Sequence, residues 1–447
     1  MKRILTLLIC ITGAVRGYSQ TQPASQSYSF SVAEAVNYAY EHQNTVLNAN
    51  LDIKSAEYRV KETIGIGLPQ LDGVASFTDY LKIPTQLLPG EFFNAPGTFI
   101  PVQFGVKYNS NLAVNATQIL FKGSYLVGLQ ASKTYKELSS RNYTRSKIDV
   151  NVNVTKAYYQ VLVSNEQIRL QDANINQLKT QLDQTIAQNK QGFVEKIDVD
   201  RIRVQYNNLV ATRENTVRSL ALNYQLLKFQ MGMPIETTLL LTNKLADISL
   251  TQNTAELAGD TSFYHNRIEY ALQETQVKLN QLDVKNKKSA YLPSLSANGT
   301  YAASYQNNSF SQLYTNSFPS AYVGLSLNVP IFNGFQRLNQ VRQAKITVFK
   351  SQNDLANLKN SLNLDAAKAN VSFLNGLQTL KNQQESQALA QEVLRVSQIK
   401  YQQGVGSSIE VTQAQTALEE ANNRYIQGLY DALVSKVDLD KAYGRIQ

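Results

Sequence analysis

Long stretches of the chain place apolar residues three, four or seven positions apart and contain neither glycine nor proline. Residues 129–191 form one such stretch and residues 193–231 form the next. Within the first stretch the apolar positions are Ile168, Ile175, Leu178, Leu182 and Ile186. This spacing puts apolar side chains on one face of a helix, as in a coiled coil. The pattern therefore predicts two long helices that pack against each other in antiparallel directions.

Four shorter segments instead alternate apolar with polar residues, which is the period of a β-strand. They cover about 70–83, 102–120, 294–306 and 320–331. Pro69 and Pro293 precede the first and third segments, and proline disfavours the helical conformation of the residue before it. We expect both prolines to mark helix-to-strand junctions, and the four segments to form two hairpins.

The order of these segments repeats along the chain. Gly404 follows Gly192 by 212 residues, and Gly444 follows Gly232 by the same distance. The Phe-x-Gly at 121–123 recurs at 332–334, and the Leu-Pro-x-Leu at 68–71 recurs at 292–295. Four anchors in the same order indicate a duplication. The predicted repeats span 28–232 and 262–444, joined by a less regular belt at 233–261.

The lengths of the segments constrain the architecture of each repeat. Phe121 to Gly192 is 71 residues, roughly 105 Å of helix at about 1.5 Å per residue, whereas only 40 residues lead on to Gly232. A helix at about 31–66 can cover the remaining length by stacking end to end with the shorter helix. We therefore expect a rod with β-hairpins at one end and two helical tips at the other.

The predicted fold class is mainly α with a membrane β-barrel. Four strands cannot close into a barrel or hide their own edges, so the strands must pair with other copies of the chain in a symmetric oligomer.

The first twenty residues have the pattern of a targeting segment. Lys2 and Arg3 precede an apolar run from Ile4 to Val15, which is typical of a secretory signal peptide spanning 1–20. A membrane anchor and a lipidated Cys10 are the alternatives. The run is short for a bilayer span, and Ile9 is not the small residue that lipid attachment prefers.

Composition removes several classes of function. The 447 residues carry 43 Lys plus Arg against 34 Asp plus Glu, with two histidines and one cysteine. The basic excess is spread along helices rather than clustered, which disfavours nucleic-acid binding. His42 and His265 lie far apart and are expected to be surface or packing residues. Asp438, Asp440 and Lys441 are expected to form a charged helix face. We expect no enzyme activity, no metal and no cofactor.

Together these features make the chain similar to the TolC-type outer-membrane efflux family. The resemblance rests on the duplication, the two Leu-Pro-x-Leu motifs, Pro-Ile-Phe-Asn-Gly at 330–334, and the x-x-x-Gly-x-x-x-x-Ile-[Asp/Glu]-Val tips. It implies a homotrimer with a twelve-stranded barrel in the outer membrane of a Gram-negative type envelope. Its helices would form a tunnel through the periplasm, docked to a periplasmic adaptor and an inner-membrane transporter. The duct would carry drugs, small molecules or proteins, and the resemblance implies no reaction.

The two tips are the candidate sites. Gly192 and Gly404 each fall between two long helices, where a residue at positive φ can end one helix. The resemblance implies that the tips contact the adaptor through Gly192, Phe193, Val194, Gly404, Val405 and Gly406. The simpler alternative is that the glycines are turn residues only.

The resemblance also implies a periplasmic aperture near the tips. Asp198 and Glu410 lie at matching positions, six residues past each glycine. Carboxylates crowded around an axis repel each other and attract cations, although a solvated helix face remains the alternative. Arg201 and Gln413 follow three residues later and depart from the family pattern, as does Gly406, which replaces a basic residue.

A second class of function stays open from the sequence. A structural coiled-coil surface protein or adhesin would share the long helices without any transport, but it needs no strands within each repeat. The substrate, the partner pump, the source organism and the resting state of the channel do not follow from the residues.

Overall fold

A computed structural model describes residues 27–93, 96–245, 248, 250 and 263–446. The predicted signal peptide lies outside the described residues, as does part of the predicted belt at 233–261. The chain divides into two compact units, each drawn from separate stretches. The first unit comprises Met1–Asn44, Val150–Gln252 and Ser372–Asp438, and the second comprises Thr45–Asp149, Asn253–Val371 and Leu439–Gln447. The units therefore cut across the two sequence repeats.

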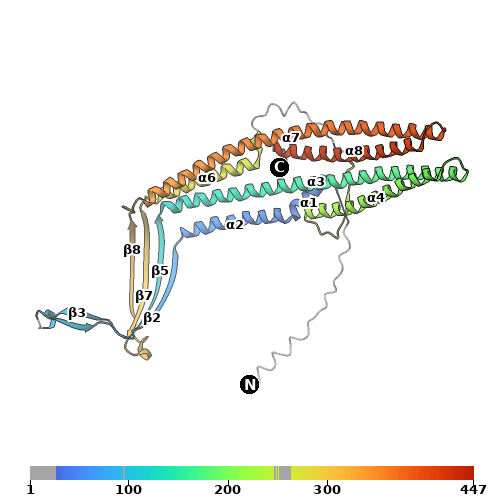
Figure 1. The fold of residues 1–447 in the computed structure, drawn as a ribbon. Coiled ribbons are helices and arrows are strands. Elements are labelled where there is room, and N and C mark those ends of the chain that lie inside the picture. The colour runs from blue at the N-terminus through green and yellow to red at the C-terminus, as the bar shows by residue number, and fades with distance from the viewer. Residues whose placement is uncertain (1–26, 94–95, 246–247, 249, 251–262, 447) are drawn as a thin grey trace, which may run out of the picture. The chain divides into compact units, whose positions relative to one another are not determined.

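Four long helices confirm the helical pattern (Figure 1). Helix α3 covers Gly123–Lys190 with 68 residues, and α4 covers Lys196–Met231 with 36. In the second repeat, α7 covers Gln336–Gln402 with 67 residues and α8 covers Ser408–Ala442 with 35. The near-equal lengths in the two repeats follow from the equal spacing of the tip glycines.

The first unit is held together by apolar seams between these helices. Leu178 and Leu182 of α3 pack against Val199, Ile202 and Leu209 of α4, as their spacing predicts. Leu394 of α7 packs in the same way against α8. A third cluster joins Val163 of α3 to α8 residues Ile426, Leu429 and Leu433. Apolar burial of this kind contributes about 25 cal/mol per Å², so the seams fix the helix pairs.

Two glycines end the shorter helices in the same way. At Gly232, φ is 71°, and the N–H groups of Gly232 and Met233 donate to the carbonyls of Phe229 and Lys228. Gly444, with φ of 69°, repeats this pattern. A Cβ at Gly232 would lie 2.6 Å from the carbonyl oxygen of His42, and one at Gly444 would lie 2.8 Å from that of Asn266. Both glycines therefore serve left-handed backbone and close packing.

The expected single helix at 31–66 is two helices. Helix α1 covers Val32–His42 and α2 covers Asn44–Ile66, with Gln43 extended between them. The break lies where the end of α4 meets the end of α1 within the first unit, so tertiary contact rather than a local glycine or proline sets it.

A short parallel ladder, absent from the sequence prediction, accompanies α1. Strand β1 (Ser27–Phe30) pairs with β6 (Thr238–Leu241). Ser31 then starts α1 through a capping box with Glu34. The buried hydroxyl of Tyr158 donates to the Phe30 carbonyl at 2.9 Å, which ties the ladder to α3.

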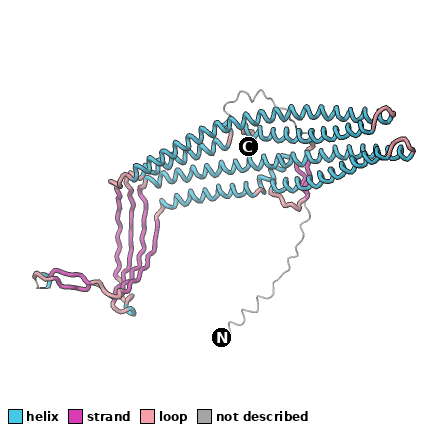
Figure 2. The backbone as a smooth tube through the Cα atoms, in the orientation of Figure 1, coloured by secondary structure: helices cyan, strands magenta, loops and turns pink. Residues whose placement is uncertain are grey.

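The second unit contains an antiparallel sheet, whose strands are magenta in Figure 2 and lie in the order β2-β5-β7-β8 that Figure 1 labels. Its strands are β2 (Gln70–Asp79), β5 (Tyr108–Phe121), β7 (Ser294–Asn307) and β8 (Phe318–Asn328). The two predicted hairpins are confirmed as β2–β5 and β7–β8, and β5 pairs with β7 between them. Strands β2 and β8 are therefore the two open edges. Pro69 lies between α2 and β2, and Pro293 lies between α6 (Ile268–Ser289) and β7.

The predicted limits of the first hairpin are wrong at its far end. An additional hairpin, formed by β3 (Thr85–Pro89) and β4 (Phe99–Gln103), is inserted between β2 and β5. The strand predicted at about 102–120 therefore covers parts of two strands. Its first two residues belong to β4, and β5 begins at Tyr108. Short 3-10 helices lie at Gly90–Phe93, Phe263–Asn266 and Phe310–Gln312.

Candidate functional site: two helical tips and a two-faced sheet

The first tip is a glycine-capped turn between α3 and α4. Gly192 has φ of 78°. Its N–H donates to the Asn189 carbonyl at 3.0 Å, and the Phe193 N–H donates to the Gln188 carbonyl at 3.0 Å. This is the Schellman pattern, which satisfies the last carbonyls of a helix. The Asn189 side chain also donates to the Val194 carbonyl at 2.8 Å and fixes the far side of the turn.

The second tip repeats this turn between α7 and α8. Gly404 has φ of 74°, and the N–H groups of Gly404 and Val405 donate to the carbonyls of Tyr401 and Lys400. Gly406 adds a third bond to Lys400, and a Cβ there would lie 2.9 Å from the Lys400 Cβ. Gly404 is needed for its backbone angle, whereas Gly406 is needed for space.

Both tips expose apolar side chains at their ends. Phe193 is 77% exposed and Val405 is 78% exposed, while Val194 is half-buried. Ile197 and Ile409 are exposed as well, at matching positions in the two repeats. Each tip therefore offers a small apolar surface on a turn that backbone hydrogen bonds hold to the end of the preceding helix.

The predicted aperture residues lie in unequal surroundings. Asp198, at the start of α4, accepts a hydrogen bond from the Ser408 hydroxyl at the start of α8, and Arg201 lies 3.5 Å from the same carboxylate oxygen. The Asp198 side chain is 18% exposed. Glu410 and Gln413 are instead exposed on α8. Asp198 and Arg201 are thus brought together, and Asp198 links the two tips within one chain.

Ser407 and Ser408, at the start of α8, make different hydrogen bonds. Ser408 donates to Asp198, whereas the Ser407 hydroxyl accepts a hydrogen bond from the Glu410 N–H at 3.2 Å. Ser407 therefore caps α8 locally, and Ser408 connects α8 to α4.

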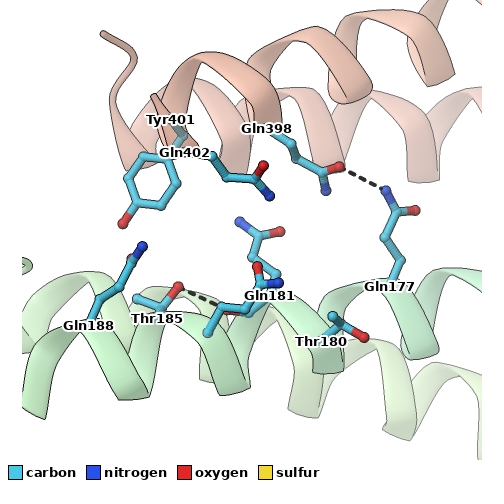
Figure 3. A pocket seen from close by; sticks show the side chains of 9 residues that line it. Gln177, Thr180, Gln181, Thr185, Gln188, Gln398, Tyr401 and Gln402 are labelled. Atoms are coloured by element: carbon cyan, nitrogen blue, oxygen red, sulfur yellow. Dashed lines mark hydrogen bonds between the residues drawn. The ribbon is translucent and has the colours of Figure 1, made fainter. Parts of the chain in front are cut away.

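Sequence reasoning missed Tyr401. Its hydroxyl is buried beside a cavity of about 250 Å³ between α3 and α7 (Figure 3). Burial raises the pKa of Tyr401, and the nearby Asp198 carboxylate raises it further. The cavity wall is mainly amide, from Gln177, Gln181, Gln184, Gln188, Gln398 and Gln402. The sequence did carry a signal. Tyr401 occupies the position equivalent to Asn189 of the first repeat, so the two repeats differ in residue type at this point.

One face of the sheet in the second unit is apolar. The register sets Leu71 beside Ala116, Ala116 beside Gly299, and Gly299 beside Val323. Val323 is 88% exposed, and Leu325 and Leu327 continue the same face along β8. Apart from Asp79, Ser110, Gln118 and Asn307, the alternate residues on this face are apolar, aromatic or glycine.

The opposite face is rich in amide and hydroxyl groups that bond across strands. Thr300 donates to Asn115 at 2.9 Å, Ser304 donates to Asn111 at 3.0 Å, and Asn298 donates to Ser326 at 2.8 Å. The apolar exceptions on this face are Val74, Ala113, Ile119, Ala302, Phe318 and Tyr322. Apolar residues on one face and polar residues on the other is the pattern of a strand between lipid and an aqueous lumen.

Aromatic rings gather at both ends of the sheet. Phe77, Tyr108 and Phe310 form a cluster at the loop end, with ring centroids 5.7–6.2 Å apart. At the helix end, Phe332 and Phe335 meet edge to face at 5.4 Å. Aromatic girdles mark the two interfaces of membrane strands.

The remaining sequence candidates are packing and ion-pair residues. His42 stacks on Tyr38 with centroids 3.9 Å apart, and His265 packs against Tyr264 and Tyr270. Asp438 pairs with Lys156 at 2.5 Å, and Lys441 pairs with Asp149 at 2.8 Å. The expected charged helix face therefore joins α8 to α3.

Among the residues that the structure describes, no group of histidine, cysteine, aspartate and glutamate is placed to hold a metal ion. None of the helices there is both long enough and apolar enough to cross a membrane.

Comparison with known proteins decides the family. A family model described as "Outer membrane efflux protein" matches residues 35–228 and 266–445. The chain belongs to the outer membrane efflux protein family. The TolC-type resemblance inferred from the sequence is thereby confirmed, as is the outer-membrane location in a Gram-negative type envelope.

Curated relatives are distant but cover most of the chain. TolC of Vibrio cholerae is 22% identical over 336 residues, 74% of this chain and 76% of that protein. The probable efflux pump outer membrane protein TtgC of Pseudomonas putida is 23% identical, covering 88% and 78%. The alkaline protease secretion protein AprF of Pseudomonas aeruginosa is 23% identical, covering 67% and 62%. TolC is named as an outer membrane protein, TtgC for an efflux pump and AprF for protease secretion.

A solved structure of CusC has the same fold. It matches with a TM-score of 0.76 and 17% identity, covering 92% of each chain. The long helices and four-stranded sheet described above are therefore the fold of this family.

Proposed function

We propose that the chain is the outer-membrane exit duct of a tripartite efflux pump or a type I secretion system. The observation that carries this proposal is the sheet, whose apolar and polar faces are separated strand by strand and whose two edges are open. A surface coiled-coil protein without transport has no use for such a sheet.

The open edges support a homotrimer. Every residue of β2 is exposed, and β8 is exposed at all positions but Gly324. In lipid each unpaired backbone group costs several kcal/mol, so edges must pair with further strands. Three copies would supply twelve strands, as the family resemblance implies, and would leave no edge.

In this trimer the apolar face meets outer-membrane lipid and the amide-rich face lines the lumen. The barrel would continue into a tunnel built from α3, α4, α7 and α8 of the three copies, extending into the periplasm. The chain then needs no catalytic group, since it provides a passage and the energy comes from an inner-membrane transporter.

The tips would serve docking and closure. Exposed Phe193 and Val405, on hydrogen-bonded turns, suit close packing against the helix ends of a periplasmic adaptor. Asp198, Arg201 and Ser408 would hold the two tips together, and Glu410 and Gln413 would face solvent at the aperture. The names of the relatives support both pump and secretion partners.

The oligomeric state tests this proposal. We expect native mass spectrometry in detergent to give a particle of three chains, because only partner strands can cover β2 and β8. A folded particle of one chain would contradict the proposal.

A further inference from the structure

The β3–β4 hairpin belongs to only one repeat. It occupies the connection between β2 and β5, whereas β7 and β8 are joined by the shorter segment 308–317. Its apolar side chains are unusually open: Leu81 is 95% exposed, Phe92 77%, Phe99 68% and Leu87 66%. An isolated two-stranded hairpin is only marginally stable in water, so this one needs a surface to cover it.

Both faces of the hairpin are apolar. The register pairs Pro89 with Phe99 on one face, and Leu88 with Ile100 on the other. Val102 continues the second face, whose apolar side chains are half-buried, whereas those of the first face are exposed. A neighbouring protein surface would cover one of these faces and leave the other in water. A lipid layer can cover both.

The few charges of the hairpin lie at its ends. Between Tyr80 and Lys107 the charged residues are Lys82, Glu91 and Lys107. Lys82 and Lys107 lie near the base, with Lys107 over the ring of Tyr108 at 5.0 Å, while Asp79 ends β2 beside them. Amines and tyrosines at one level, with apolar residues beyond them, suit a membrane interface with anionic headgroups.

The hairpin also starts at the aromatic girdle of the sheet. It leaves β2 at Asp79 and rejoins β5 at Tyr108, next to the Phe77, Tyr108 and Phe310 cluster. The apolar residues of the hairpin are therefore joined to the apolar sheet face at the level of this girdle, where Asp79, Lys82 and Lys107 stand between the two apolar surfaces along the chain.

We propose that the β3–β4 hairpin lies in the outer leaflet of the membrane and binds its anionic lipids as an interfacial anchor. Leu81, Leu87, Phe92 and Phe99 enter the acyl region, and Lys82 and Lys107 meet phosphate groups of the lipids. The proposal rests on the proposed function in one respect only, namely that the sheet itself sits in the membrane.

The chain contains no tryptophan, so a single introduced tryptophan reports one position. We would place the full-length protein in nanodiscs of phosphatidylcholine and phosphatidylglycerol, with and without brominated acyl chains. Phe99→Trp tests the hairpin, Leu325→Trp reports the apolar sheet face, and Phe193→Trp reports the tip. Acrylamide in the buffer measures access from water.

We expect brominated lipid to reduce the emission of Phe99→Trp about as much as that of Leu325→Trp, and acrylamide to reduce it much less than that of Phe193→Trp. Replacing Lys82 and Lys107 with glutamine should weaken the lipid quenching in nanodiscs that contain phosphatidylglycerol, and should have little further effect once phosphatidylglycerol is omitted or salt is raised.

Two outcomes would overturn the anchor. Quenching of Phe99→Trp by acrylamide alone would place the hairpin in water, and protection from both quenchers would place it against protein. The proposed function fails separately, if Leu325→Trp shows no lipid quenching. A lipid-exposed Leu325→Trp beside a water-exposed Phe99→Trp rejects only the hairpin proposal.

Discussion

Asp198 shows how a single carboxylate can have two partners with different roles. The Ser408 hydroxyl connects it to the other tip, and Arg201 balances its charge from one turn along α4. Because the side chain is mostly covered, a lost partner leaves the carboxylate poorly solvated. The exposed Glu410, at the equivalent position in the second repeat, carries no such constraint. Duplicated positions have therefore acquired different surroundings.

Ser408→Ala should loosen the tips. A hydrogen bond to a charged group contributes about 1.5–3 kcal/mol, so its loss should shift a closed-to-open equilibrium roughly 10- to 100-fold. Open probability in single-channel recordings measures the effect. Ser407→Ala is the matched control, because it removes only the local cap of α8. Equal open probabilities for the two variants would mean that Ser408 does not hold the tips.

Substitutions at the tip glycines can test docking to the adaptor independently of folding. Gly192 and Gly404 have open space around an added Cβ, so only the left-handed backbone resists substitution. Gly192→Glu with Gly404→Glu should abolish export by placing charge on the adaptor surface, while the trimer still forms. Asparagine tolerates left-handed backbone, so the double asparagine variant should retain most export. Drug susceptibility, or secretion of a passenger protein, in cells that contain the assembled variant measures this. Full export by the glutamate variant would leave both glycines as turn residues only.

Among the helices and strands, short-range sequence patterns predicted those features that neighbouring residues along the chain determine. The apolar spacing of α3 and the glycines at 192, 232, 404 and 444 set helix ends that the structure reproduces within a few residues. The β1–β6 ladder was missed because its strands have four residues each and pair across about 210 positions. The β3–β4 hairpin was not predicted because its strands contain Pro89 and Pro101, and proline is unfavourable in paired strands. The break at Gln43 depends on contact with Gly232, which no local pattern encodes.

The same limit applies to the candidate site. Matching positions in the repeats identified Asp198 and Glu410, but repeat symmetry predicts equal surroundings for them. Ser408 and Tyr401 lie on segments more than 200 residues from Asp198, so their proximity depends on how α4, α7 and α8 pack.

The two faces of β8 should respond differently to the same substitution. Leu325→Arg puts a charge on the apolar face, where it costs about 2–4 kcal/mol near the centre of a bilayer. Ser326→Arg, one residue later, puts the charge on the polar face and loses only the Asn298 hydrogen bond. We expect Leu325→Arg to lower the yield of trimer in the outer membrane and the urea midpoint of its unfolding. Ser326→Arg should assemble normally and change ion selectivity. Similar losses for both variants would contradict the assignment of the faces.

We infer that one polypeptide supplies a third of a barrel and a third of a tunnel. In the proposed trimer, three copies of Asp198 and Glu410 would surround one axis at the aperture. Repulsion among carboxylates favours bound cations, so closure depends on helix packing and on the ions present.

Current through the purified protein in planar lipid bilayers would show whether the trimer forms an open duct. We predict discrete conductance steps from the wild-type trimer, blocked by divalent cations, with a weaker block in the Asp198→Ala, Glu410→Ala double variant. Unchanged block in the double variant would remove these carboxylates from the aperture. Absence of any current from trimers whose sheet is shown to be in lipid would contradict the exit duct itself.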